Sequence, residues 1–164
     1  VFYWECLNFM EITQRLPIKL MIEITENQTL TITPALKELI RSLRNRGVLF
    51  ALDDFGTGYA NLCYLNELDL DIIKIDKTFI KAIKEVEQHI PMLESIIHLS
   101  GLLGLRIVAE GVEHDFQQQW LGKQRVDYLQ GYQFLPPVTF SDFIRYYKHS
   151  VSLYEPVSGS TFST

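Results

Sequence analysis

The stretch Val48-Leu-Phe-Ala-Leu-Asp-Asp-Phe-Gly-Thr-Gly-Tyr59 decides which fold this chain is expected to adopt. An apolar run rich in β-forming residues ends in two adjacent carboxylates, Asp53 and Asp54, and a loop with two glycines follows. Side chains alternate between the two faces of a strand, so neighbouring carboxylates belong where a strand stops and its end opens on a cleft. A simple turn is the alternative interpretation, because Asp and Gly are common in turns.

Four further stretches of the chain have the same organisation, and segments with helical spacing separate them. Such alternation is typical of βαβ units, and it predicts an α/β fold in which helices pack outside a parallel sheet. The expected strands lie at about 19–25, 48–54, 71–76, 106–113 and 126–132. The expected helices lie at about 5–15, 34–46, 60–68, 77–84, 89–103, 115–123 and 141–149.

Polar residues gather near the C-terminal ends of these strands, which is where (β/α) barrels and open α/β sheets carry their chemistry. The shared rim makes the turn interpretation of the first stretch much weaker. The residues expected on this rim are Glu23, Asp53, Asp54, Lys74, Asp76, Glu110 and Gln130.

Several carboxylates around one cleft repel each other unless cations lie between them. Ligation by oxygen alone suits Mg²⁺ or Mn²⁺ rather than Zn²⁺. Two such ions can clamp a phosphodiester and activate a water molecule for in-line attack, and Lys74 adds a positive charge for the phosphate. The alternative for Lys74 is a structural ion pair with Asp76 or Glu110.

Composition narrows the possible classes of protein. The chain has 164 residues, a formal net charge of -5 and 47% hydrophobic residues, as expected for one globular domain with a core. The acidic balance argues against binding to duplex nucleic acid, and no apolar run approaches the ~18–20 residues that span a bilayer.

Cys6 and Cys63 are expected to be small buried residues, and no chemistry is assigned to the histidines. The chain starts at Val1, so we expect it to be a piece of a longer protein.

The motifs together resemble the EAL domain, the bacterial phosphodiesterase of cyclic di-GMP. Five matching pieces occur in family order over about residues 17–140, and their agreement makes the resemblance specific. The pieces are Glu23-Ile-Thr-Glu26, Asp53-Asp54-Phe-Gly-Thr-Gly-Tyr59, Lys74-Ile-Asp76, Glu110-Gly-Val-Glu113 and Gln130-Gly-Tyr132. The resemblance implies a TIM-like (β/α) barrel that cuts cyclic di-GMP to linear pGpG with two Mg²⁺ or Mn²⁺ ions.

The resemblance also implies residue roles. Glu23, Asp53 and Asp76 resemble metal ligands, and Asp54 is similar to the ligand of the second metal. Glu110 and Lys74 correspond to the residues that orient or activate water, so the implied catalytic set is Glu110, Lys74 and Asp54. The implied supporting residues are Glu26, which anchors the loop with Gly56, Thr57 and Gly58, and Glu113 and Gln130 at the edge of the metals and substrate.

Three family features are absent from these residues. The Glu-Ala-Leu strand with its metal-binding Glu is missing, as is the Asn that completes the metal site, and Pro136-Pro137 stands where the family has Arg-Pro. A whole barrel needs eight strands, whereas about five are expected here. We therefore expect an incomplete barrel over residues 1–149 and a flexible tail over 150–164. The missing strands would come from an N-terminal segment or from another chain.

The expected function is hydrolysis of cyclic di-GMP in bacterial second-messenger signalling, with little or no activity for this chain alone. The alternatives are a non-catalytic module that binds cyclic di-GMP or a protein partner, and an unrelated half-barrel metal enzyme. The resemblance further implies a homodimer through helices near 60–68 and 77–84. A cytoplasmic location is expected, with a parent chain that upstream modules could anchor to a membrane.

Overall fold

A computed structural model of the chain describes residues 2–13, 18–25, 31–56 and 62–152. The chain divides into two compact units, Val1–Gln133 and Phe134–Thr164. The second unit contains helix α7, Phe140–Ser152, which continues past the expected end at His149. Residues 153–164, the greater part of the expected tail, lie outside the described residues.

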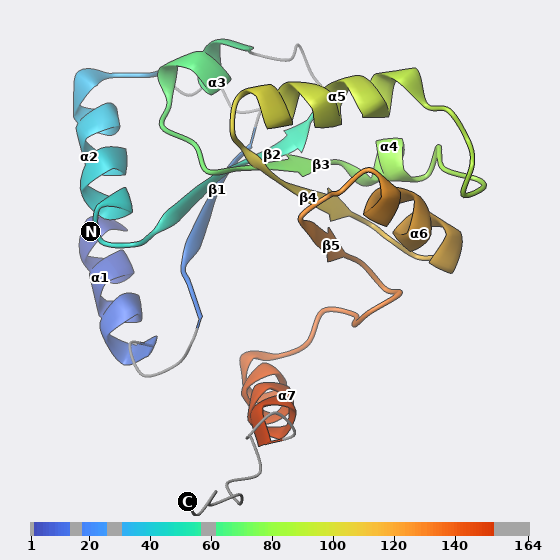
Figure 1. Cartoon of the computed structure of the whole chain (residues 1–164). Helices are drawn as coiled ribbons and strands as arrows, with labels where there is room; N and C mark the ends of the chain where they lie inside the picture. The colour runs from blue at the N-terminus through green and yellow to red at the C-terminus, as the bar shows by residue number, and fades with distance from the viewer. Residues whose placement is uncertain (1, 14–17, 26–30, 57–61, 153–164) are drawn as a thin grey trace, which may run out of the picture. The chain divides into compact units, whose positions relative to one another are not determined.

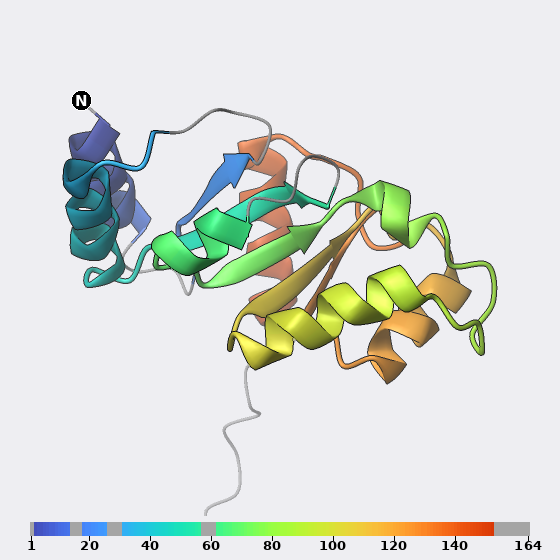
Figure 2. The ribbon, with the colours of Figure 1, turned by 90° about the horizontal axis from the view of Figure 1, so that it is seen from above.

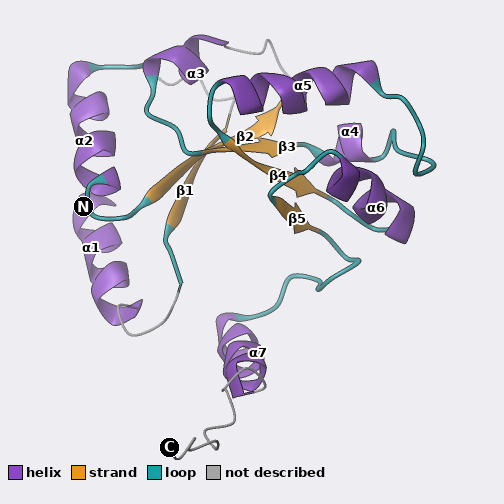
Figure 3. Ribbon diagram, viewed as in Figure 1, coloured by secondary structure: helices purple, strands orange, loops and turns teal. Residues whose placement is uncertain are grey.

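The first unit is built on one parallel sheet of five strands, as the sequence predicts (Figures 1 and 3). The strands are hydrogen-bonded in the order β1-β2-β3-β4-β5, so each strand lies beside its neighbour in the chain. In the part of the chain that the structure describes, β1 and β5 form the two edges of this sheet and are not paired with each other. The bounds of the strands are β1 Met21–Thr25, β2 Leu49–Phe55, β3 Ile72–Ile75, β4 Arg106–Glu110 and β5 Tyr128–Gln130.

Helices connect the strands at the expected places, with some changes in length. The helices of this unit are α1 Phe2–Thr13, α2 Pro34–Arg44, α3 Leu62–Glu67, α4 Lys77–Ile80, α5 Pro91–Leu102 and α6 Asp115–Lys123. α2 begins as predicted, because the Thr33 hydroxyl accepts a hydrogen bond from the Leu36 amide at 3.2 Å. None of the described helices is long and apolar enough to cross a bilayer.

Several elements are shorter than predicted; the strand expected over 106–113, for example, ends at Glu110, and for two others local hydrogen bonds explain where they end. The helix expected over 77–84 ends at Ile80, and the following loop is held by Gln88, whose amide contacts Lys84 N and Ala82 O. The strand expected over 126–132 ends at Gln130, because the chain then turns and the Gln133 amide bonds back to Val112 O.

The two faces of the sheet differ in what they bury. Helices α3, α5 and α6 lie along one side of the sheet (Figure 2). The core on this face includes Leu52, Ile73, Ile75 and Trp120. The opposite face has a small apolar cluster, formed by Ala51, Ile72 and Val108 with Met21 and Leu49. Because side chains alternate along a strand, this second face also carries Asp53, Lys74 and Glu110, each two residues beyond a member of the small cluster. The site is therefore built on the face of the sheet away from the helical core.

Cys6 is buried and has a free thiol, as expected. The side chain of Cys63 lies outside the described part of the chain.

Candidate active site

Lys74 is the centre of a group of opposite charges that we call the Lys74–carboxylate cluster: Lys74 with Glu23, Asp53 and Glu110. The Lys74 Nζ atom lies 2.7 Å from Glu23 Oε1, 2.9 Å from Asp53 Oδ1 and 2.6 Å from Glu110 Oε1. Residue Lys74 is only 3% exposed, so water screens these contacts poorly. The sequence analysis kept an ion pair of Lys74 with Asp76 or Glu110 as the alternative interpretation; the described residues show the pair with Glu110, and carboxylates of β1 and β2 join it.

The register of the sheet brings these residues together from four strands. On β1, Glu23 lies opposite Ala51, and Thr25 lies opposite Asp53. Glu23 is therefore on the same face as Asp53, two residues nearer the start of the paired strands. Lys74 lies opposite Val108 on the neighbouring strand. A lysine side chain is long enough to reach from its own strand to carboxylates on both sides.

Asp54 joins the same site because β2 is irregular at this point. The pairing of β2 with β3 shifts register between Leu52 and Phe55, which indicates a β-bulge with one extra residue on β2. Asp54 has a φ of 55°, a left-handed conformation that Asp adopts more readily than most residues. As a result, oxygens of Asp53, Asp54 and Glu110 all lie within 4.8 Å of one another.

The protonation equilibria of Lys74 and Glu110 reflect this crowding. Burial acts against the charged form of Lys74, but the contacts with Glu110, Glu23 and Asp53 outweigh it and raise the pKa of Lys74. Burial also raises the pKa of Glu110, and the contact with Lys74 offsets this only in part. Lys74 is thus firmly charged, whereas the carboxylates around it carry more negative charge than one ammonium neutralises.

Asp54 and Asp76 differ in how they are stabilised. Burial raises the pKa of Asp54, and the negative charges of Asp53 and Asp76 raise it further. Asp76 caps helix α4, where its Oδ1 accepts a hydrogen bond from the Thr78 amide at 2.8 Å. Burial acts to raise the pKa of Asp76, but the hydrogen bonds from Thr78 and the Lys77 backbone outweigh it and lower this pKa. Asp76 therefore stays ionised close to the cluster.

The residues present fit a divalent cation. Among the described residues, Asp53 Oδ1 is a buried side-chain oxygen without a hydrogen bond; Lys74 Nζ, 2.9 Å away, contacts it only as an opposite charge. The three converging oxygens of Asp53, Asp54 and Glu110 are hard donors of the kind that Mg²⁺ and Mn²⁺ prefer. The raised pKa values of Asp54 and Glu110 also indicate negative charge that a further cation would neutralise.

Gly56 stands at the start of the glycine loop, and only glycine fits there. Its φ is +92°, and a Cβ atom at this position would lie 2.8 Å from the ring of Phe79 on the turn of α4. Gly56 thus lies directly against Phe79 of α4, the helix whose first residue follows Asp76. Three other predicted residues of this region, Glu26, Thr57 and Gly58, lie outside the described residues.

Glu113 and Gln130 lie beside the cluster rather than in it. Gln130 is paired with Glu110 across β4 and β5, and Glu113 follows β4 with an exposed side chain. The structure adds a residue that the sequence analysis missed, Gln117 on α6, which is 3% exposed. Its Oε1 atom accepts hydrogen bonds from the backbone amides of Glu113 at 2.8 Å and His114 at 3.1 Å.

Gln117 also donates a hydrogen bond to Ile80 O at 3.1 Å, at the end of α4. One buried amide therefore ties the loop after Glu110 to the helix that Asp76 caps. The bond to the His114 amide is half of a capping box, which Gln three residues after the N-cap signals locally, whereas the bond to Ile80 has no sequence signal because it depends on which segments pack against α6.

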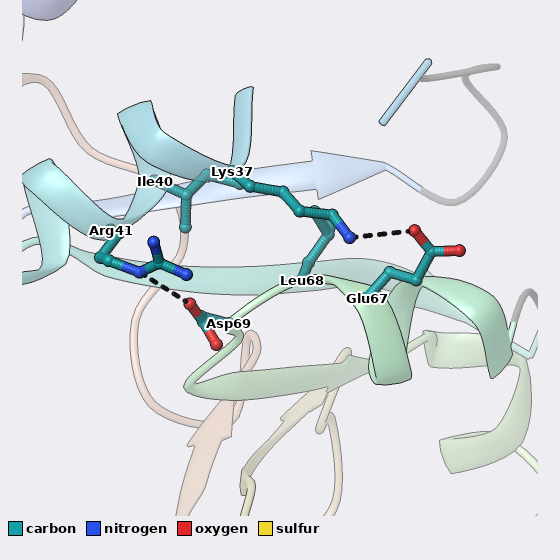
Figure 4. Close-up of a pocket in the computed structure, with 6 residues that line it drawn as sticks. All are labelled: Lys37, Ile40, Arg41, Glu67, Leu68 and Asp69. Atoms are coloured by element: carbon teal, nitrogen blue, oxygen red, sulfur yellow. Dashed lines mark hydrogen bonds and ion pairs between the residues drawn. The ribbon is translucent and has the colours of Figure 1, made fainter. Parts of the chain in front are cut away.

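A pocket of about 170 Å³ lies away from this cluster and is lined by Lys37, Ile40, Arg41, Glu67, Leu68 and Asp69 (Figure 4). Every charged residue that lines it faces an opposite charge. Lys37 Nζ lies 3.1 Å from Glu67 Oε2, and Arg41 Nε lies 4.0 Å from Asp69 Oδ2. This pocket is thus a set of ion pairs that fasten α2 to the connection between α3 and β3, and we assign it no chemistry.

Comparison with known proteins is consistent with this geometry. The model of the family described as the EAL domain matches residues 5–137. The chain is 42% identical over 142 residues to the cyclic di-GMP phosphodiesterase PdeL of Escherichia coli, which covers 85% of this chain and 39% of that protein. It spans between 25% and 39% of the length of three such curated relatives.

Two solved structures show the same fold. The EAL domain of Mycobacterium smegmatis DcpA matches with a TM-score of 0.71 and 28% identity, over 88% of this chain and 66% of that one. A manganese and cyclic di-GMP complex of Klebsiella pneumoniae BlrP1 matches with a TM-score of 0.60 and 28% identity, over 76% of this chain and 33% of that one. The five-stranded sheet corresponds to part of a TIM-like barrel.

Proposed function

Because the chain belongs to the EAL domain family, we propose that it is part of a metal-dependent phosphodiesterase that hydrolyses cyclic di-GMP to linear pGpG. This activity would serve bacterial second-messenger signalling. The observation that carries the proposal is the convergence of Asp53, Asp54 and Glu110 around one point, with Lys74 beside them. The relatives named as cyclic di-GMP phosphodiesterases and the manganese complex of a structural neighbour support the substrate and the type of metal.

We assign the metal-binding role to Glu23, Asp53, Asp54 and Asp76. All four are carboxylates of the cluster or its immediate surroundings, and each of the other three influences the ionisation of Asp54. Two Mg²⁺ or Mn²⁺ ions held by these residues would supply Lewis-acid polarisation of the phosphodiester and a lowered pKa for a water molecule.

Glu110 and Lys74 act on the reacting groups in this proposal. The raised pKa of Glu110 makes it a better proton acceptor for the attacking water than an exposed glutamate. Lys74 keeps its positive charge and balances the negative charge that develops on the phosphate. Glu26, Gly56, Thr57, Gly58, Glu113 and Gln130 are proposed to support the loop and the substrate edge.

The test is turnover of cyclic di-GMP with Mn²⁺, measured on this chain and on a version extended at the N-terminus. We expect the extended version to produce pGpG and this chain to show little or no activity, because two ligands of the family site are missing. Absence of turnover by the extended version would sink the proposal. Binding of cyclic di-GMP without turnover would instead favour the second candidate, a non-catalytic binding module, which the incomplete sheet makes worth testing.

The open edge at β1 is a proposed contact for the missing barrel strands. A groove of about 420 Å³ lies beside β1 and is lined mainly by apolar side chains of α1, β1 and α2, together with Glu23. An N-terminal segment or another chain would pair with this edge and cover the groove. The expected gain is a clear rise in melting temperature for the extended version.

A homodimer through the helices near 60–68 and 77–84 is also proposed. A groove of about 240 Å³ adjoins the first of these helices; Leu65 and Asn66 of α3 line it together with Leu99 and Leu103 at the end of α5. Light scattering should show a dimer for the unmodified chain and a monomer for Leu103→Glu. A cytoplasmic location is proposed on the basis of the substrate alone.

A further inference from the structure

We propose that Lys74 is an internal counter-cation that holds the carboxylates together when no metal is bound. A divalent cation that enters the site then replaces Lys74 as the partner of Asp53. The inference deepens the proposed function, since it concerns how the same site is loaded. It assigns Lys74 control of metal affinity in addition to any part in hydrolysis.

The first observation is that the number of carboxylates around Lys74 equals the number of hydrogen-bond donors on its ammonium group. A lysine ammonium has three donors, and three carboxylates lie within 2.6 to 2.9 Å of Nζ. The side chain is almost fully buried, so these carboxylates take the place of water as its surroundings. Without this cation the acidic side chains would repel one another at close range.

The second observation is that the three contacts of Lys74 are unequal. Its distances to Glu110 and Glu23 are 2.6 and 2.7 Å, whereas its distance to Asp53 Oδ1 is 2.9 Å. That oxygen of Asp53 is also buried without an aligned hydrogen bond among the described residues. Asp53 Oδ1 is therefore the oxygen of the cluster that can accept a further cation.

The third observation is that Lys74 and the candidate metal position share carboxylate neighbours. Asp53 and Glu110 contact Lys74, and the same two residues converge with Asp54 into the group of oxygens within 4.8 Å. A divalent cation in that group would repel the ammonium a few ångströms away and would compete with it for Asp53. Asp54 completes the oxygen group, and the charge of Lys74 acts on it as well.

These relationships predict effects of opposite sign on folding and on metal binding. Removing the charge of Lys74 should destabilise the metal-free chain, because unneutralised carboxylates are left close together. The same change should strengthen metal binding, because the competing cation is gone. A lysine that only supports the fold would alter stability alone, and a lysine that helps to bind the metal would weaken binding when removed.

The experiment compares Lys74→Met with Lys81→Met, since Lys81 is exposed on the turn after α4 and its loss changes the net charge equally. Mn²⁺ binding is measured by titration calorimetry and melting temperature is measured in excess chelator. We expect Lys74→Met to bind Mn²⁺ at least tenfold more tightly and to melt at a lower temperature without metal, with Lys81→Met unchanged. Equal or weaker binding by Lys74→Met would overturn the inference.

A second measurement on the unmodified chain covers the case in which Lys74→Met does not fold. The ammonium of Lys74 can be followed by ¹⁵N–¹H NMR during a titration with Mg²⁺, because burial slows exchange of its protons. We expect its signal to shift or broaden as Mg²⁺ binds, while signals of exposed lysines stay in place. A Lys74 signal that is unchanged at saturating Mg²⁺ would contradict the proposal that the metal replaces Lys74 at Asp53.

These outcomes are separable from failure of the proposed function. Tighter Mn²⁺ binding by Lys74→Met without turnover of cyclic di-GMP by the extended version would support the counter-cation and reject the phosphodiesterase. Turnover by the extended version together with weaker Mn²⁺ binding by Lys74→Met would support the phosphodiesterase and reject the counter-cation.

Discussion

Asp53 and Asp54 are neighbours in strand β2, and yet their carboxylate oxygens converge with each other instead of pointing to opposite faces. In a regular strand one of them would face the helical core. The bulge between Leu52 and Phe55, with Asp54 at a φ of 55°, turns both toward the same point. The two negative charges are thus held close enough to repel each other, and this repulsion destabilises the folded chain when no metal is bound.

Replacing Asp54 by Asn should therefore stabilise the metal-free chain. Asn tolerates the left-handed conformation and keeps one acceptor oxygen, while the repulsion by Asp53 and Asp76 disappears. Because water partly screens the site, we expect a gain of no more than about 1 kcal/mol in the free energy of unfolding at neutral pH.

The gain from Asp54→Asn should depend on pH in a defined direction. The pKa of Asp54 is raised in the folded state, so the native chain binds this proton more tightly than the unfolded chain. The unmodified chain then loses stability as pH rises from about 4, the unfolded value, through the raised folded value. Chemical denaturation should show a growing advantage of the variant toward neutral pH and none at about pH 3. An advantage that is the same at both pH values would disprove the assignment.

Mn²⁺ should stabilise the chain, and the effect should require Asp53. At a concentration about 100 times the dissociation constant, a ligand that binds only the folded state adds about 2.7 kcal/mol. For a chain of this size, each kcal/mol raises the melting temperature by about 2–4 °C. Chelator should reverse the rise. Asp53→Asn should abolish it, whereas Asp69→Asn, which removes an acid at the remote pocket, should leave it intact.

Gly131→Ala should strongly destabilise the fold. A Cβ at this position would lie 2.1 Å from Val112 O, and backbone cannot move aside as a side chain can. We expect a loss of about 3 kcal/mol or more in the free energy of unfolding. Gly122→Ala is the matched control, because it lies within α6 and a Cβ there meets nothing within 4 Å. That variant should gain about 0.5–1 kcal/mol, since alanine favours a helix.

Gln117→Leu should loosen the loop that carries Glu113. The change leaves two backbone amides and the Ile80 carbonyl without their partner, at a cost of about 1–3 kcal/mol for each unsatisfied group. Hydrogen exchange should be faster at Glu113 and His114 in this variant. Gln118→Leu, at the exposed neighbouring position, should leave both amides protected. Unchanged exchange in Gln117→Leu would show that the loop does not depend on this side chain.

Most of the fold could be predicted from local patterns. Apolar runs with β-forming residues marked all five strands, and the Thr33-Pro34 pair marked the start of α2. Lengths were less predictable, since α4 ends at Ile80 only because Gln88 holds the next loop in another conformation. An ion pair of Lys74 with Asp76 or Glu110 was only an alternative interpretation, and the contacts with Glu23 and Asp53 were not foreseen, because strand periodicity does not tell how far a lysine reaches across neighbouring strands.

The sequence by itself determined that acids and one lysine would meet on a parallel sheet, because strand periodicity and chain order are local properties. Only the tertiary structure decided how those charges are shared. The bulge that unites Asp53 and Asp54, the three contacts of Lys74 and the bridge through Gln117 all join segments far apart in the chain, or break a local rule. Such features follow from strand register and packing, which fix distances that no single stretch of sequence contains.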